Sequence, residues 1–276
     1  MATLRPRAVL VTRATDYENL LAVHATREQA AFFLKSRGQT LDGLMTAHEA
    51  VAAAVRAVRA AIPDTWRLAQ ADRADLDRFL FGPEDVIVVV GQDGLVANLA
   101  KYLRGQPVLG VNPAPDVIEG VLVPLRSEQV GRLAAAAAAG AAALERRTMV
   151  EATLDDGQSL RALNEIFVGH RSHQSARYRI SVGDRSEPQS SSGVIVATGT
   201  GATGWARSIM TATDRDVRLS PTDRSLAYFV REPWPSVATG AAIAWGITAI
   251  FGFQQFGLPT VLVGLAFFFS GALLFV

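Results

Sequence analysis

The chain has 276 residues, of which 49% are hydrophobic and 19% charged, and its formal net charge is +1. This length can form one large or two ordinary domains with a buried core. The balance of 27 basic against 26 acidic residues argues against a nucleic-acid-binding protein, and the absence of cysteine excludes disulfides, thiolate metal sites and cysteine nucleophiles.

The first part of the chain is predicted to be an open α/β domain. Its predicted strands are Ala8–Val11, Asp85–Val90 and Pro107–Val111, and its predicted helices are Arg27–Lys35, Thr40–Ile62 and Leu95–Leu103. The sequence DVIVVV of Asp85–Val90 is apolar and β-branched, which is typical of a strand buried on both faces of a parallel sheet. Strand, glycine turn, helix and strand form a βαβ unit, so we assign residues 1–125 to this domain.

The second part of the chain is predicted to be all-β after one helix. The alanine-rich stretch Ser127–Arg147 favours a helix. From Thr148 to Val230, short runs of alternating apolar and polar residues are separated by DDG, VGD and the polar patch SEPQSSSG. Many short strands with turn signals between them indicate a β-sandwich, which we assign to residues 126–236.

The carboxyl-terminal residues 237–276 differ in composition, because no charged residue follows Glu232. The uncharged run 257–276 has about the length that a helix needs to cross a ~30 Å hydrocarbon core. With the apolar segment 237–253 it predicts a two-helix membrane hairpin or a single carboxyl-terminal anchor. The alternatives are strands that complete the sandwich, or a native ending lost to a sequence error or a fusion. The amino-terminal sequence MATLRPRAVLVTRA lacks the apolar run of a signal peptide, so we otherwise expect a cytoplasmic protein.

A glycine turn, Gly91-Gln92-Asp93-Gly94, directly follows the buried strand. Glycines allow close approach of the backbone to a phosphate, and Asp93 could take a proton or orient Mg²⁺. Asp-Gly is also an ordinary tight turn, and the turn is no Walker motif, since no Gly-Lys-Ser/Thr follows.

Two further constellations lie in the second part. Asn164-Glu165 precedes an apolar strand and could bind ribose hydroxyls or an amide, although taken alone an exposed strand start explains it better. In the sequence GVIVATGTGATGWARS an apolar strand leads into interleaved glycines and threonines, whose amides and hydroxyls suit a polyphosphate or a sugar. His170 and His173 have no acidic or cysteine partner nearby in the sequence, so we interpret them as loop residues and predict no metal ligands.

These three constellations, in this order, resemble the NAD kinase family. GQDG stands at the position of the family's GGDG, Asn164-Glu165 at its Asn-Glu pair, and SSSGVIVATGTGATGW at its Asp-Gly, strand and Thr-Pro-Thr-Gly-Ser-Thr-Ala-Tyr stretch. Gln92 and Ser192 replace a glycine and an aspartate of the family pattern. Gly199 and Gly204 replace a proline and an alanine, which predicts a looser loop.

The resemblance implies a nucleotide-binding α/β domain followed by a dinucleotide-binding β-sandwich. It implies phosphoryl transfer from ATP, with Mg²⁺, to the adenosine-ribose 2′-hydroxyl of NAD or NADH, and Asp93 as the general base. It implies nucleotide contacts from this set of residues: Gly91, Gly94, Asn164, Glu165, Thr200, Gly201, Thr203, Gly204, Trp205 and Ser208. We also expect a homo-oligomer.

Two alternatives from other functional classes stay open. Diacylglycerol and sphingosine kinases share a GGDG-type turn, and an apolar tail would suit a lipid substrate. A nucleotide-binding sensor without turnover would retain the same pocket residues.

Overall fold

The computed structural model describes residues 5–249 and 260–262. The chain divides into two compact units, Met1–Leu144 and Glu145–Val276. The sequence prediction placed a boundary near residue 125. The difference arises because a helix after that point, α5 (Val130–Ala138), packs on the sheet of the first unit.

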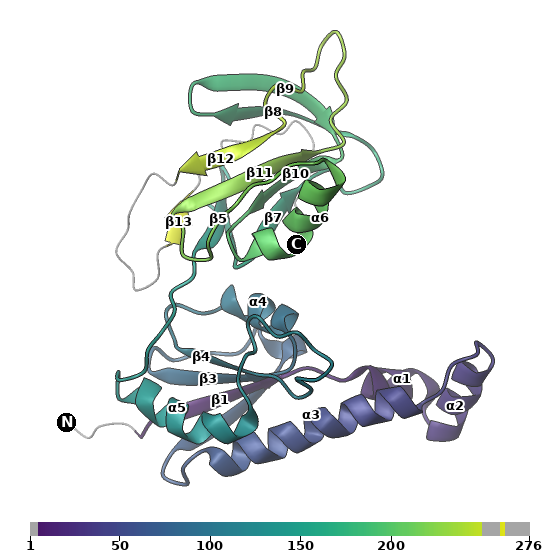
Figure 1. Ribbon diagram of the computed structural model, residues 1–276, viewed down its shortest axis with the longest axis vertical. Helices are drawn as coiled ribbons and strands as arrows, with labels where there is room; N and C mark the ends of the chain where they lie inside the picture. The colour runs from purple at the N-terminus through teal and green to yellow at the C-terminus, as the bar shows by residue number, and fades with distance from the viewer. Residues whose placement is uncertain (1–4, 250–259, 263–276) are drawn as a thin grey trace. The chain divides into compact units, whose positions relative to one another are not determined.

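The first unit is a parallel α/β layer structure (Figure 1). Its four strands lie in the order β2-β1-β3-β4 and all pair in parallel. The strands are β1 (Arg7–Thr12), β2 (Arg67–Asp72), β3 (Asp85–Val90) and β4 (Val108–Val111). The helices are α1 (Asp16–His24), α2 (Arg27–Lys35), α3 (Asp42–Ala61), α4 (Asp93–Ala100) and α5, with 3₁₀ turns η1 (Arg73–Asp75) and η2 (Ser127–Gln129).

Alternating side chains of the central strands pack on opposite faces of this sheet. Val86, Val88 and Val90 of β3 pack with α3 and α5, whereas Ile87 and Val89 pack with α4. All six residues of β3 are buried, so the prediction of a strand buried on both faces of a parallel sheet is confirmed. The helices on the two sides are visible in Figure 1.

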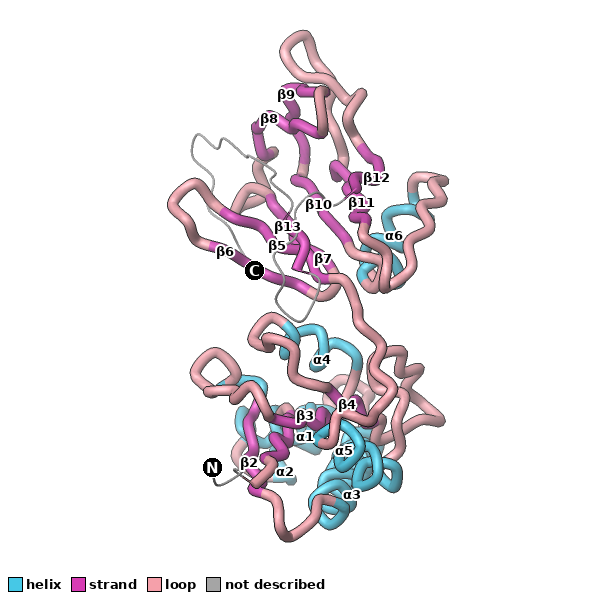
Figure 2. The backbone as a smooth tube through the Cα atoms, turned by 90° about the vertical axis from the view of Figure 1, so that its left-hand side faces the viewer, coloured by secondary structure: helices cyan, strands magenta, loops and turns pink. Residues whose placement is uncertain are grey.

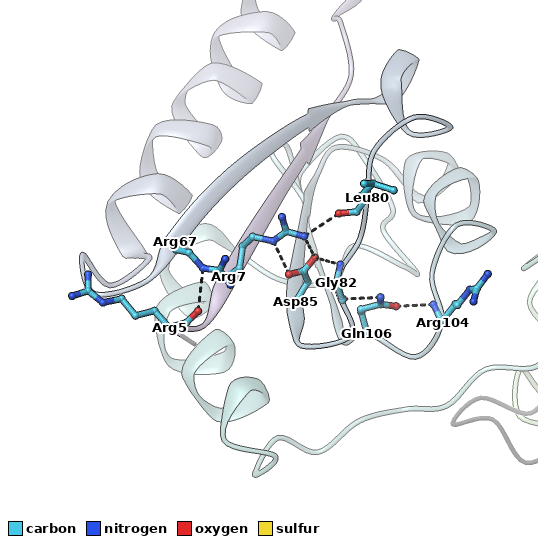
Figure 3. A network of polar contacts seen from close by, with 8 residues as sticks. All are labelled: Arg5, Arg7, Arg67, Leu80, Gly82, Asp85, Arg104 and Gln106. Carbon is cyan, nitrogen blue, oxygen red and sulfur yellow. Dashed lines mark hydrogen bonds and ion pairs between the residues drawn. The ribbon is translucent and has the colours of Figure 1, made fainter. Parts of the chain in front are cut away.

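An ion pair fixes the amino-terminal edge of this sheet (Figure 3). Arg7 of β1 donates to both carboxylate oxygens of Asp85 on β3, at 2.7 and 2.5 Å, and Asp85 is 3% exposed. The same carboxylate accepts the Gly82 N–H, and Gln106 donates to the Gly82 carbonyl. The hydrogen bond to Asp85 raises the pKa of Arg7. These contacts lie at the edge opposite the glycine turn, so they hold the strands rather than form a site.

In its described residues, the second unit consists of β-sheets and one α-helix (Figure 2). The sheets have the orders β12-β11-β10-β7, β13-β5-β6 and β8-β9. Their strands are β5 (Met149–Thr153), β6 (Ser159–Ala162), β7 (Glu165–Val168), β8 (Ala176–Val182), β9 (Arg185–Ser191), β10 (Gly193–Ala197), β11 (Ser225–Arg231), β12 (Trp245–Ala249) and β13 (Thr260–Leu262). The 3₁₀ turn η3 (Gly201–Thr203) and helix α6 (Trp205–Ala212) follow β10.

The core of this unit has two parts on either face of β10 and β11. Val194 and Val196 pack into a cluster that β5, β7, β8 and β11 also enter, while Ile195 and Ala197 pack against α6. Figure 2 shows α6 on one side of β10 and β11, and β5 and β6 on the other. The unit is therefore a layered β structure, and together the two units give a mixed α/β fold.

Several sequence predictions are corrected. The alanine-rich helix ends at Ala138 rather than Arg147, because Gly140 adopts a φ of +68° that other residues disfavour. The polar patch SEPQSSSG is mostly strand β9 rather than a turn, with Gln189 and Ser191 buried. Helix α4 begins at Asp93 and ends at Ala100, earlier at both ends than predicted.

The predicted membrane hairpin is wrong in its first segment. Residues Trp245–Ala249 form strand β12, which pairs antiparallel with β11. Residues 260–262 of the second segment form β13, which pairs with β5, and its remaining residues lie outside the described part of the chain. In residues 5–249 and 260–262, no helix is both long and apolar enough to span a bilayer.

Candidate active site

The glycine turn lies at the carboxyl end of β3, where Asp93 begins α4. The Gly91 N–H donates to the Val111 carbonyl at 3.1 Å, so this amide is not free for a phosphate. Gln92 is exposed and makes no side-chain cap bond to the helix. Gly94 is also exposed, and a Cβ there would meet no atom within 4 Å. The turn is thus open around Gly94 and closed around Gly91.

The Asp93 carboxylate holds the loop that follows β4. Its Oδ1 accepts the N–H groups of Leu122 at 2.7 Å and Val123 at 3.2 Å, and its Oδ2 accepts that of Val121 at 3.0 Å. A carboxylate offers about four acceptor positions. Three are occupied, so Oδ2 retains the one position at which Asp93 could accept a substrate proton.

Asn112 supports the same loop and was missed by the sequence reasoning. Its Nδ2 donates to the Ile118 carbonyl at 2.8 Å, and its Oδ1 accepts the Ala114 N–H at 3.0 Å. The signal was the Asn112-Pro113 dipeptide, since an asparagine before proline favours a turn. Asn112 therefore positions the segment that Asp93 binds.

In the second unit, Thr198 joins the loop after β10 to the start of β7. Its Oγ1 donates to the Leu163 carbonyl at 2.6 Å and accepts the Gly201 N–H at 3.1 Å, and its backbone N–H donates to the Asn164 carbonyl. A Cβ on Gly201 would lie 2.1 Å from the Asn164 carbonyl oxygen. Only glycine allows this approach, so the threonine–glycine loop and the Asn164-Glu165 pair lie together, as the resemblance requires.

Within the part of the chain that the structure describes, three buried polar atoms on these two segments have no hydrogen-bond partner. They are Asn164 Oδ1, Glu165 Oε2 and Thr200 Oγ1. Leaving a buried polar group unpaired costs about 1–3 kcal/mol, so three such atoms on two segments that Thr198 joins indicate a ligand. Burial also raises the pKa of Glu165. Two of the atoms are pure acceptors and the third is a hydroxyl, so the cluster suits hydroxyl or amino donors.

The expectation that the amides of this loop bind a phosphate is wrong, because they are already used within the loop and the unpaired atoms are acceptors. The Gly201 amide is already bonded to Thr198, and the amides of Ala202, Thr203 and Gly204 donate to carbonyls within the loop. The expected loosening at Gly199 is also wrong, because a Cβ there would lie 1.9 Å from the Ser220 carbonyl oxygen. The chain segment at Ser220 occupies the space that a proline ring would need.

Trp205 begins α6 beside this cluster. Its ring centroid is 5.6 Å from that of Phe167, and the Arg231 guanidinium lies 5.4 Å from the Trp205 ring centre. Trp205 is 41% exposed, so part of its ring is available for stacking on a base. Phe167 and Arg231 were not predicted from the sequence. Thr203, Gly204 and Ser208 are exposed around the start of the same helix.

The described residues contain no group of three or more His, Asp or Glu side chains that could hold a metal ion. His170 lies in a loop, where its Nδ1 accepts the Ser172 N–H at 3.1 Å. Mg²⁺ is commonly held by one or two carboxylates together with substrate phosphates. The glycine turn holds no carboxylate besides Asp93, whose one remaining Oδ2 position is the place for a substrate proton. A Mg²⁺ at this turn would therefore be held by the phosphates of the donor.

The sequence is similar to that of a curated NAD kinase. The NAD kinase of Chlorobaculum tepidum is 28% identical over 140 residues, which are 50% of this chain and 47% of that protein. The resemblance to the NAD kinase family is confirmed. The chain thus matches about half the length of this NAD kinase, and no protein-family model matches it.

Two NAD(H) kinase structures are loosely similar in fold. An NAD kinase from Archaeoglobus fulgidus in complex with ATP aligns with a TM-score of 0.47 and 20% identity, covering 88% of this chain and 76% of that one. Yeast NADH kinase complexed with NADH aligns with a TM-score of 0.49 and 15% identity, covering 95% and 79%.

Proposed function

We propose that the protein is an ATP-dependent kinase that phosphorylates the 2′-hydroxyl of NAD or NADH to give NADP or NADPH. The similarity to the NAD kinase of C. tepidum supports the reaction class. The observation that carries the proposal is the cluster of unpartnered Asn164, Glu165 and Thr200 oxygens, because the ribose hydroxyls and base amine of a dinucleotide supply the missing donors.

In this proposal each unit contributes separate groups. The second unit binds the dinucleotide through the cluster, with Trp205 stacking on a ring and Gly201, Thr203, Gly204 and Ser208 lining the pocket. We interpret the described β-sheets of this unit as the predicted β-sandwich. The first unit supplies Gly94, at the open side of the phosphoryl-transfer turn, and Asp93 as the base, while Gly91 holds the turn through its bond to the Val111 carbonyl.

The proposed step transfers the terminal phosphoryl group of ATP. The 2′-hydroxyl oxygen forms the new P–O bond, its proton moves to Asp93 Oδ2, and ADP leaves. Mg²⁺ held by the donor's phosphates would supply positive charge against the negative charge that builds up in this transfer. The homo-oligomer and the cytoplasmic location stay predictions.

A binding protein without turnover is the second candidate, and one observation favours it. Three of the four acceptor positions of Asp93 are already used by backbone N–H groups, which limits its capacity as a base. The two candidates give different products from the same ligands.

The test offers the purified full chain ATP and Mg²⁺ with NAD, NADH or diacylglycerol, and follows the phosphorylated product. We expect NADP or NADPH, lost in Asp93→Asn, with dinucleotide binding weakened in Asn164→Ala. Binding of NAD without any product would establish the sensor instead. Phosphorylated lipid without NADP would overturn the proposal in favour of a lipid kinase.

A further inference from the structure

A hollow of about 460 Å³ lies in the first unit and belongs to none of the motifs above. Its size falls within the ~300–1,000 Å³ range of small-molecule sites. Its polar lining comes from the segments that follow β1 and β2 and from the end of α4: Arg13, Asn19, Asp72, Arg73, Asp77, Asn98 and Tyr102. We call it the Arg13 pocket.

The strand register places this pocket next to the glycine turn. Val11 pairs with Val89 across β1 and β3, so Arg13, two residues further on, is level with Gly91. On the other side of β1, Thr12 pairs with Asp72. The strand order reverses between β1 and β3, and in open α/β sheets ligands bind outside the carboxyl ends of the strands at that point.

The pocket offers acceptors for hydroxyl groups and a surface for a base. Asp72 Oδ1 accepts the Ala74 N–H at 2.9 Å, while its Oδ2 has no bond within the described residues and can accept from a ribose diol. The half-buried ring of Tyr102 can stack on a base, whose edge the Asn98 amide can bind. This set is suited to a nucleoside.

The cations of the pocket suit phosphate. Arg13 has one long ion-pair contact, 4.0 Å from Asp16 Oδ1, and Arg73 is exposed. Asp72 and Asp77 also line the pocket, Asp77 lies 3.8 Å from Arg78, and Asp16 lies near Arg13, so the acidic and basic groups here are equal in number, which disfavours a bare polyanion. A ligand with a neutral hydrogen-bonding part and an anionic part fits this balance better.

We propose that the Arg13 pocket binds the nucleoside of a nucleoside triphosphate, with the phosphates running past Arg13 to the glycine turn. This proposal rests on the proposed kinase function, for which it assigns the donor site. Asn98 follows Asp93 by five residues, so it lies about 7.5 Å along the α4 axis from that residue. An extended triphosphate chain spans a similar length.

The test measures equilibrium binding of ATP with Mg²⁺, and separately of NAD, to the full chain by calorimetry. Base–aromatic stacking contributes about 1–3 kcal/mol, so Tyr102→Ala should weaken ATP binding about tenfold. Arg13→Ala should weaken it by a similar factor, and Tyr102→Phe should bind ATP as the wild type does. NAD affinity should not change in these variants. The matched control is Phe32→Ala, an exposed aromatic residue of the first unit outside this pocket, which should leave both affinities unchanged.

The outcomes separate this proposal from the kinase function. Unchanged ATP affinity in Arg13→Ala and Tyr102→Ala overturns the pocket, even if the protein forms NADP. Weakened ATP binding in these variants of a protein that forms no NADP supports the pocket and overturns the kinase. If Tyr102→Ala fails to fold, the two other variants decide. Weakened ATP binding in Arg13→Ala together with retained ATP binding in Tyr102→Phe supports the pocket.

Discussion

The loop bound by Asp93 provides a direct test of what this aspartate does. Asp93→Ala removes the acceptor of three backbone N–H groups. Bonds to a charged acceptor contribute about 1.5–3 kcal/mol each, less where water can replace the partner. The bonds from Leu122 and Val123 are partly buried, whereas that from Val121 is exposed, so the bond from Val121 contributes least. We expect a loss of about 2–4 kcal/mol in the free energy of unfolding.

Asp93→Asn should be milder. The Asn Oδ1 can still accept the N–H groups of Leu122 and Val123, while its Nδ2 would face the Val121 N–H, another donor. We expect a loss of about 1–2 kcal/mol, together with loss of kinase activity because the amide cannot take a proton. This variant therefore separates the catalytic role from most of the structural one.

The assay is urea unfolding of the full chain with hydrogen exchange at the amides of residues 121–123. The control is Asp116→Asn, an exposed carboxylate in the same loop, which should change stability by less than about 0.5 kcal/mol. If Asp93→Ala unfolds at the same urea concentration as this control and its 121–123 amides exchange at the wild-type rate, the structural role is refuted.

Three further predictions concern other contacts. Burial raises the pKa of Glu165 above its unfolded value of about 4.3, so the free energy of unfolding should fall as pH rises from the unfolded to the folded pKa. Glu165→Gln should therefore be more stable than wild type near pH 7 and equal to it at pH 3.5, and it should bind NAD more weakly. Unfolding curves of the two proteins that do not converge at low pH would contradict this. Asp85→Asn should lose about 3 kcal/mol of unfolding free energy, because it leaves the guanidinium of Arg7 without its ionic partner; a loss no larger than that of Asp116→Asn would count against this. Gly201→Ala should lower the free energy of unfolding by about 1–3 kcal/mol, because the added Cβ would meet the Asn164 carbonyl. The control Gly43→Ala, at a helical position of α3 with open space around it, should raise it by about 0.5–1 kcal/mol. Equal effects of the two substitutions in a thermal unfolding assay would show that position 201 does not need the close approach of a glycine.

Much of the fold could be predicted where one local signal sufficed. The apolar run of β3 was predicted with the bounds observed, and the helical pattern that starts at Arg27 and is ended by Gly38 was predicted where α2 lies. Helix α1 was missed although Thr15 and Glu18 form a capping box, and β2 was missed because its residues are mostly polar or small. The polar strand β9 was missed for a related reason, since only its pairing with β8 shows that Gln189 and Ser191 face the core.

Part of the candidate site could likewise be predicted from local sequence, and part depended on tertiary contacts. The sequence by itself placed GQDG, Asn164-Glu165 and the threonine–glycine loop after or before strands, since glycine turns and strand ends are local features. The roles of these residues depended on tertiary contacts between segments distant in sequence. Those contacts engage Asp93 with residues 121–123 and the Gly201 amide with Thr198.

Composition showed that the chain has no cysteine, balanced charge and an uncharged end after Glu232, and those facts are independent of any fold. It could not decide what the uncharged end forms, because an apolar segment can be buried by lipid or by a neighbouring strand. Only the pairing of Trp245–Ala249 with β11 decided this for the first part of the segment. A strand's partner lies elsewhere in the chain, so its register is set by the tertiary structure and not by the segment itself.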